Sequence, residues 1–256
     1  MTTTHSVNTP RLRLGLYMWI AGMLGVAVLL AEVVPQLLAD GPISAPLWLV
    51  LTASIAQSAL LLALAVWVGV VLAPKVGLQA TVFEAAVTTR SIKSALRPLL
   101  LPGLVGGMLG GVGLFAIGSY FSPAALAEVE QQFSPSILAR VLYGGITEEL
   151  LLRWGLLTAL VWLAWRFLQH RSGSPRPIYT WFAIVVSALI FGAGHLPAAA
   201  TLVGELTTDV VVFIVTANTV FGVLFGYLYW RYGLEAAIIA HASAHLVNYF
   251  LGLAIA

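Results

Sequence analysis

The chain has 256 residues and a mean hydropathy of +0.98; 60% of its side chains are hydrophobic and only 9% are charged. Soluble domains carry about 25% charged residues, so the composition excludes an ordinary soluble domain and predicts a polytopic membrane protein. The 12 basic residues are too few and too scattered for a nucleic-acid-binding face, so no nucleic acid is expected as a partner. The chain has no cysteine, which excludes disulfides, thiolate metal sites and a cysteine nucleophile.

Seven apolar stretches are long enough to cross the membrane, since a helix needs about 20 residues to span about 30 Å of hydrocarbon. In chain order they are 14–38, 46–73, 98–121, 137–168, 178–199, 209–230 and 234–255. Only helices and closed barrels satisfy their backbone in lipid, and these stretches are too long and continuous for barrel strands. We therefore predict an all-α transmembrane helix bundle of about seven spans, forming a single membrane domain over residues 1–256.

Charge predicts how this bundle is oriented. Ten of the basic residues fall at span ends on one side of the membrane: Arg11, Arg13, Lys75, Arg90, Lys93, Arg97, Arg166, Arg171, Arg176 and Arg231. The other ends carry acidic residues, namely Asp40, Glu128, Glu130, Glu205 and Asp209. The positive-inside rule then predicts a cytoplasmic N-terminus and an outside C-terminus. We expect the protein in a prokaryotic plasma membrane.

Segment 78–97, between the second and third spans, is too polar to cross the membrane. Its apolar residues share one helical face, with Arg90, Lys93 and Arg97 beside it. This pattern is typical of an amphipathic helix on the cytoplasmic membrane surface. A basic loop fits the same residues equally well.

Glycines recur at helical spacing in the third span. Gly103, Gly107 and Gly111 are four apart, and Gly106 and Gly110 form a second ridge. Small residues at this spacing let helix backbones approach closely in a membrane. We therefore predict a packing role for this span.

The fourth span contains the acidic residues Glu148 and Glu149, although an ionisable group inside a membrane costs about 2.5–3.5 kcal/mol on insertion scales. Glu149 and Arg153 are four residues apart, so they share a helical face and can pair. Glu148 is rotated by about 100° from Glu149, which leaves it available for chemistry. A poorly solvated carboxylate of this kind suits a general base.

Histidines are concentrated in the fifth and seventh spans. His195 ends the run that begins at Phe191, and His241 and His245 are four apart, with Asn248 continuing their face. The pair can bind a metal or donate hydrogen bonds to an oxyanion, and a packing role is an equal alternative. Ala242 follows His241, so the glutamate of a His-Glu-x-x-His zinc helix is missing.

Three motifs in this order resemble the CPBP family of intramembrane proteases, which includes the type II CAAX prenyl endopeptidases. The pattern Glu-Glu-x-x-x-Arg falls at 148–153, Phe-x-x-x-His at 191–195 and His-x-x-x-Asn/Asp at 241–245. The resemblance covers 138–252, which we expect to be the catalytic core. His245 departs from the pattern, because it stands where the family has Asn or Asp. Asn248, one turn further on, is the nearest amide.

The resemblance implies a peptidase mechanism. Glu148 and His195 would activate a water, His241 and His245 would stabilise the oxyanion, and Glu149 and Arg153 would hold the helix geometry. The substrate would be a membrane-anchored or lipid-modified, CAAX-like peptide.

Whether a metal takes part stays open at this point. Relatives are often described as metalloproteases, although a glutamate-activated water needs no metal. If a divalent metal such as zinc took part, Glu148, His195, His241 and His245 would be its candidate ligands.

Two other functions stay open. A catalytically silent scaffold or bacteriocin-immunity-type protein could share the fold, and His245 is the residue that most favours it. A proton-coupled transporter could use the same acids and histidines as a relay. It predicts polar residues along a path through both leaflets, whereas the sequence has local clusters and an apolar first half.

Overall fold

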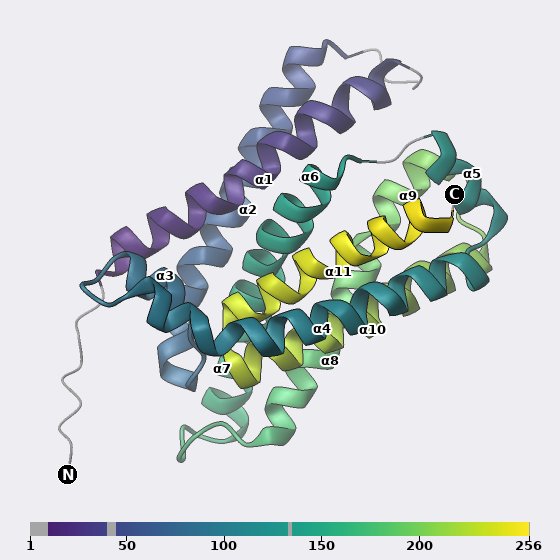
Figure 1. The fold of residues 1–256 in the computed structure, drawn as a ribbon. Coiled ribbons are helices and arrows are strands. Elements are labelled where there is room, and N and C mark those ends of the chain that lie inside the picture. The colour runs from purple at the N-terminus through teal and green to yellow at the C-terminus, as the bar shows by residue number, and fades with distance from the viewer. Residues whose placement is uncertain (1–9, 40–44, 133–134, 256) are drawn as a thin grey trace.

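A computed structural model describes residues 10–39, 45–132 and 135–255, and over these residues the chain is helical, with no strand (Figure 1). Seven segments are long and apolar enough to cross a membrane: Arg11–Gln36, Leu47–Val76, Ile92–Phe121, Ile137–Leu168, Pro177–Val203, Thr208–Tyr232 and Leu234–Ile255. The predicted all-α bundle of seven spans is confirmed, and the chain is an integral membrane protein. Asp40 and the side chain of Glu130, used above for orientation, lie outside the described part.

The helical elements follow one another along the chain with short connections. They are α1 (Arg11–Ala39), α2 (Leu47–Leu72), η1 (Ala73–Val76), α3 (Thr81–Ala86), α4 (Ile92–Phe121), α5 (Ala124–Gln132), α6 (Ile137–Ala139), η2 (Arg140–Glu148), η3 (Leu150–Leu157), α7 (Thr158–Leu163), η4 (Ala164–Leu168), α8 (Pro177–Gly194), α9 (Leu196–Val203), α10 (Thr208–Tyr232) and α11 (Leu234–Ile255). The run from α6 to η4 is the fourth span, and η2, η3 and η4 within it are π-helical. Short π-helical insertions are frequent at functional sites, and here η2 ends at Glu148.

The glycine ridges of α4 pack against α11, as their spacing predicts. A Cβ on Gly103 would lie 2.7 Å from Cγ2 of Ile239, and one on Gly107 would lie 2.9 Å from the carbonyl oxygen of Ala240. No real Cβ fits at such distances. The backbone of α4 at these glycines therefore lies directly against α11. In lipid, close contact of this kind replaces the hydrophobic effect as the force that joins helices.

A buried core fills the end of the bundle where α1 begins and α10 ends. Its largest side chains include Trp154 of η3 and Tyr229 of α10, both about 1% exposed. The Tyr229 hydroxyl lies 2.8 Å from Oγ1 of Thr158, so both polar groups are satisfied inside the core. A smaller core at the opposite end joins α9 to α10 through Ala199, Val210 and Ile214.

Segment 78–97 differs from both predictions. Only Thr81–Ala86 is a short helix, and it is held by Glu235 of α11, whose Oε1 accepts hydrogen bonds from the backbone N–H groups of Val82 (2.8 Å) and Phe83 (2.9 Å). Residues 92–97 belong instead to the third span, which begins six residues earlier than predicted. The cause is a helix cap, because Oγ of Ser91 accepts a hydrogen bond from the backbone N–H of Ser94.

Candidate active site

The two adjacent glutamates of the fourth span have different environments. Glu149 is fully buried, and its Oε1 lies 3.0 Å from Nη1 of Arg153. The same oxygen accepts a hydrogen bond of 2.8 Å from Nδ1 of His241 on α11. The Glu148 side chain is 15% exposed and faces a cavity. The geometry therefore leaves Glu148 as the carboxylate that a substrate can reach.

Among the described residues, Arg153 is the only arginine or lysine beside the buried Glu149. Its guanidinium group has a hydrogen-bond acceptor and two aromatic rings around it. Its Nη2 donates to the carbonyl oxygen of Gly222 on α10 at 3.2 Å. Its guanidinium carbon lies 5.0 Å from the ring centroid of Phe191 and 5.5 Å from that of Phe225. A buried charge is tolerated when it is paired and hydrogen-bonded, so Arg153 ties the fourth span to α8 and α10.

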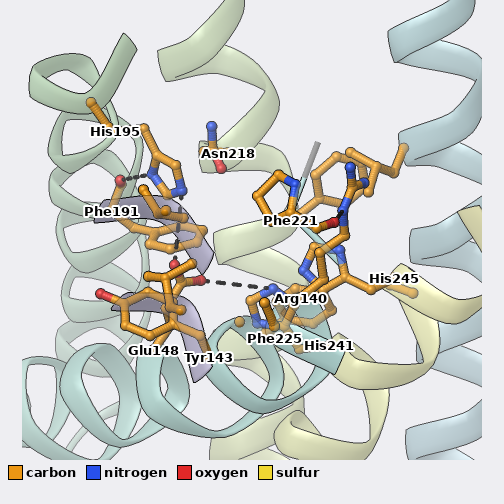
Figure 2. Close-up of a pocket in the computed structure, with 18 of the residues that line it drawn as sticks. Arg140, Tyr143, Glu148, Phe191, His195, Asn218, Phe221, Phe225, His241 and His245 are labelled. Atoms are coloured by element: carbon orange, nitrogen blue, oxygen red, sulfur yellow. Dashed lines mark hydrogen bonds and ion pairs between the residues drawn. The ribbon is translucent and has the colours of Figure 1, made fainter. Parts of the chain in front are cut away.

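Glu148 lies between two imidazole rings (Figure 2). Its Oε1 is 4.0 Å from Nε2 of His195, and its Oε2 is 3.9 Å from Nε2 of His241. These separations are too long for direct hydrogen bonds, and a water that bonds to both partners would lie beside the line that joins them. The three motifs thus meet around one carboxylate, although they come from helices far apart in the sequence.

The partners of the ring nitrogens decide which atoms of the histidines carry protons. Nδ1 of His195 lies 2.9 Å from the carbonyl oxygen of Phe191, which can only accept, so Nδ1 holds a hydrogen and, in the neutral ring, Nε2 presents a lone pair to Glu148. Nδ1 of His241 likewise donates to the carboxylate of Glu149. In the neutral state Nε2 of His241 is therefore an acceptor. The oxyanion role predicted for His241 requires the ring to hold a second proton.

His245 and Asn248, the remaining residues of the third motif, lie differently. The ring of His245 stacks on that of His241 with centroids 5.0 Å apart, and it lines the same cavity as Glu148. Its buried Nδ1 has no hydrogen-bond partner within the described chain. Asn248 lines a neighbouring hollow instead, so the structure does not bring the substitute amide to Glu148.

The cavity has a volume of about 390 Å³ and a mostly apolar wall. Four polar residues that the sequence analysis did not single out also line it: Arg140, Tyr143, Thr201 and Asn218. Tyr143 lies one helical turn before Glu148, and Asn218 is the single amide in the sixth span, so both carried a signal. Nδ2 of Asn218 donates to the carbonyl oxygen of Ile214 at 2.8 Å, and Nε of Arg140 donates to that of Pro135 at 3.0 Å.

A metal is the cofactor that the resemblance raised. Across the described ranges, no group of three or more His, Asp or Glu side chains is arranged to hold an ion. Nδ1 of His241 donates to Glu149, which leaves Nε2 as the ring atom that could bind an ion. The four candidate ligands therefore form no preassembled metal site among the described residues.

Comparison with known proteins found a family model that matches part of the chain. Residues 130–247 match the family model described as type II CAAX prenyl endopeptidase Rce1-like. No curated protein and no solved structure matches the chain. The matched residues include all three motifs, and the resemblance predicted from them is confirmed.

Proposed function

We propose that this Rce1-like membrane protein is an intramembrane endopeptidase that hydrolyses a peptide bond in a membrane-anchored or lipid-modified substrate. The observation that carries the proposal is the position of Glu148. It is the accessible one of two adjacent carboxylates, it faces two imidazole nitrogens at 4.0 and 3.9 Å, and it lies at the floor of an apolar cavity. A carboxylate in such surroundings is suited to taking a proton from water.

In the proposed reaction, a water held between Glu148 and His195 attacks the carbonyl carbon of the scissile bond. As the new O–C bond forms, the water proton passes to Glu148 and the carbonyl electron pair moves onto oxygen. Glu148 then returns the proton to the amide nitrogen, and the C–N bond breaks. His195 orients the water through the lone pair on Nε2, because Nδ1 is fixed by the carbonyl oxygen of Phe191.

The oxyanion is assigned to His241 and His245. Glu149 holds His241 through Nδ1, and when the ring carries a second proton its Nε2 can donate to a developing negative charge. His245 stacks on His241 and has no competing partner on its Nδ1 among the described residues. Glu149 and Arg153 act as positioning residues, since both are buried and neither lines the cavity.

The catalytic core of 138–252 does not enclose the cavity alone. Leu29 and Val33 of α1 and Gly110 and Leu114 of α4 complete its wall. These residues, with Phe221 and Phe225, present an apolar surface suited to a membrane anchor or a lipid chain. We therefore assign substrate contact to the first half of the chain as well.

The transporter alternative receives less support. A relay needs a polar path through both leaflets, but the fourth span beyond Glu148 is packed into the core at Trp154, Leu157 and Val161. The scaffold alternative rests on His245 alone. Replacing His245 by Asn restores the family pattern. A change in the rate of cleavage then supports the peptidase, whereas no cleavage either before or after the replacement supports the scaffold.

The decisive experiment compares wild type with Glu148→Gln in liposomes containing a library of lipid-modified and membrane-anchored peptides, with products read by mass spectrometry. Glu205→Gln, an exposed loop variant with the same change of charge, is the matched control. Cleavage by wild type and the control, but not by Glu148→Gln, supports the proposal. Equal cleavage by all three contradicts the role of Glu148. A parallel incubation with a chelator tests metal dependence.

A further inference from the structure

Most of the cavity lies in one half of the bundle, and it extends toward the middle at Phe225 of α10 and His241 of α11. The spans that contain α1, α4 and α9 begin at the basic end, and their lining residues all lie in the second half of each span. The fourth span runs the other way, and its lining residues lie in its first half. In Figure 1, α1 begins at one end of the bundle, whereas α5, α9 and the last turn of α11 gather at the other. The cavity is therefore displaced toward the α5 and α9 end.

The basic end of the bundle is closed beneath Glu148. The next residues of the fourth span toward that end, Glu149, Arg153, Trp154 and Thr158, are each at most 2% exposed. They belong to or adjoin the main core, in which Tyr229 closes the space from α10. Protein interiors packed in this way admit no continuous water path, so water and substrate cannot reach Glu148 from the basic end.

The opposite end is open and more polar. A second hollow of about 890 Å³ shares Leu114, Asn218 and His245 with the catalytic cavity. Its outer part is lined by Ser119 and Ser122, at the end of α4, among others. This hollow connects the α5 and α9 end to the catalytic cavity through these shared residues.

Charge identifies the two ends. The basic residues of the described chain, apart from Arg140 and Arg153, lie at the closed end, and the acidic residues Glu128, Glu205 and Asp209 lie at the open one. Under the positive-inside rule the closed end is cytoplasmic. The open end then faces the outside of the cell.

We infer that the catalytic cavity opens away from the cytoplasm, so that its substrate is a membrane-anchored segment of an exported protein, reached from the outer leaflet. That the occupant is a substrate rests on the proposed function, but the direction of opening rests on the fold and charge alone. A lipidated peptide anchored in the cytoplasmic leaflet would meet the closed end.

The absence of native cysteine permits a direct test. Single cysteines would be introduced at Leu114 in the cavity, at Val112 on the lipid-facing side of the same helix, at Ala125 on α5 and at Ser174 in the loop between η4 and α8. A charged, membrane-impermeant thiol reagent would be applied to intact cells and to inverted membrane vesicles. Labelling would be read by mass shift.

We expect Leu114→Cys and Ala125→Cys to be labelled at least tenfold faster in intact cells, and Ser174→Cys only in inverted vesicles. Val112→Cys, at similar depth but in lipid, should react slowly in both. Labelling of Leu114→Cys only in inverted vesicles, or in neither preparation, would overturn the inference. Labelling of Ala125→Cys only in inverted vesicles would overturn it as well. The labelling requires no cleavage, so failure of the peptidase proposal is recognised separately, by the Glu148→Gln comparison.

Discussion

Nδ1 of His241 lies 2.8 Å from Oε1 of Glu149, across 92 residues of sequence. That bond joins the first and third motifs, and it directs the other ring nitrogen of His241 toward Glu148. Glu149 is therefore used to hold the site together, and Glu148 is left facing the cavity, where the proposed reaction takes place.

Glu149→Gln should destabilise the protein as well as inactivate it. The change removes the charge opposite Arg153, which stays buried without a carboxylate, and breaking a buried pair from one side costs about 3–5 kcal/mol. We expect a lower midpoint of thermal unfolding in detergent than for wild type or Glu148→Gln. Equal midpoints for the two glutamate variants would refute the division of roles.

His195→Ala should slow cleavage with little loss of stability. His195 is partly exposed, and in the proposed reaction it orients the attacking water, whose misplacement can cost up to about 100-fold in rate. The control is His170→Asn, which alters an exposed histidine in a left-handed turn that Asn tolerates. A rate for His195→Ala within a few-fold of this control would count against its role.

Gly144→Ala should damage the site rather than the fold. An added Cβ would lie 2.7 Å from Nε2 of His245 and 3.4 Å from Nε2 of His241, so the His245 ring must move. A misplacement of about 1 Å can cost up to about 100-fold in rate. We expect kcat to fall while the unfolding midpoint changes little. Gly15→Ala, where the nearest side chain is 3.7 Å away, should leave both unchanged or raise stability slightly.

Gly107→Ala should separate α4 from α11. The new methyl group would meet the carbonyl oxygen of Ala240 at 2.9 Å and the side chain of Ser243. Overpacking of this kind costs about 1–3 kcal/mol, although alanine is the better helix former. A lower unfolding midpoint than that of Gly15→Ala is expected, and a higher one would show that the two helices can move apart freely.

The sequence by itself determined the class of fold and the number of spans. Continuous apolar runs near 20 residues have one solution in lipid, because each backbone group must be bonded within its own helix. The spacing of Glu149 and Arg153, and of the α4 glycines, is also local information, since a helix converts it directly into a shared face. The three motifs could be placed in a family for the same reason: their residues stand at short, fixed intervals.

Only the tertiary structure decided which atoms meet. It determined the partner of Nδ1 in His241, the distance from Glu148 to either imidazole, and the position of Asn248 outside the catalytic cavity. All three depend on how the helices cross, which the spacing of residues in the sequence does not specify. The start of α4 at Ile92 and the docking of α3 on Glu235 depend likewise on a cap and on a contact between distant segments. So does the closed end beneath Glu148, because close packing arises only when several apolar helices fill the same space.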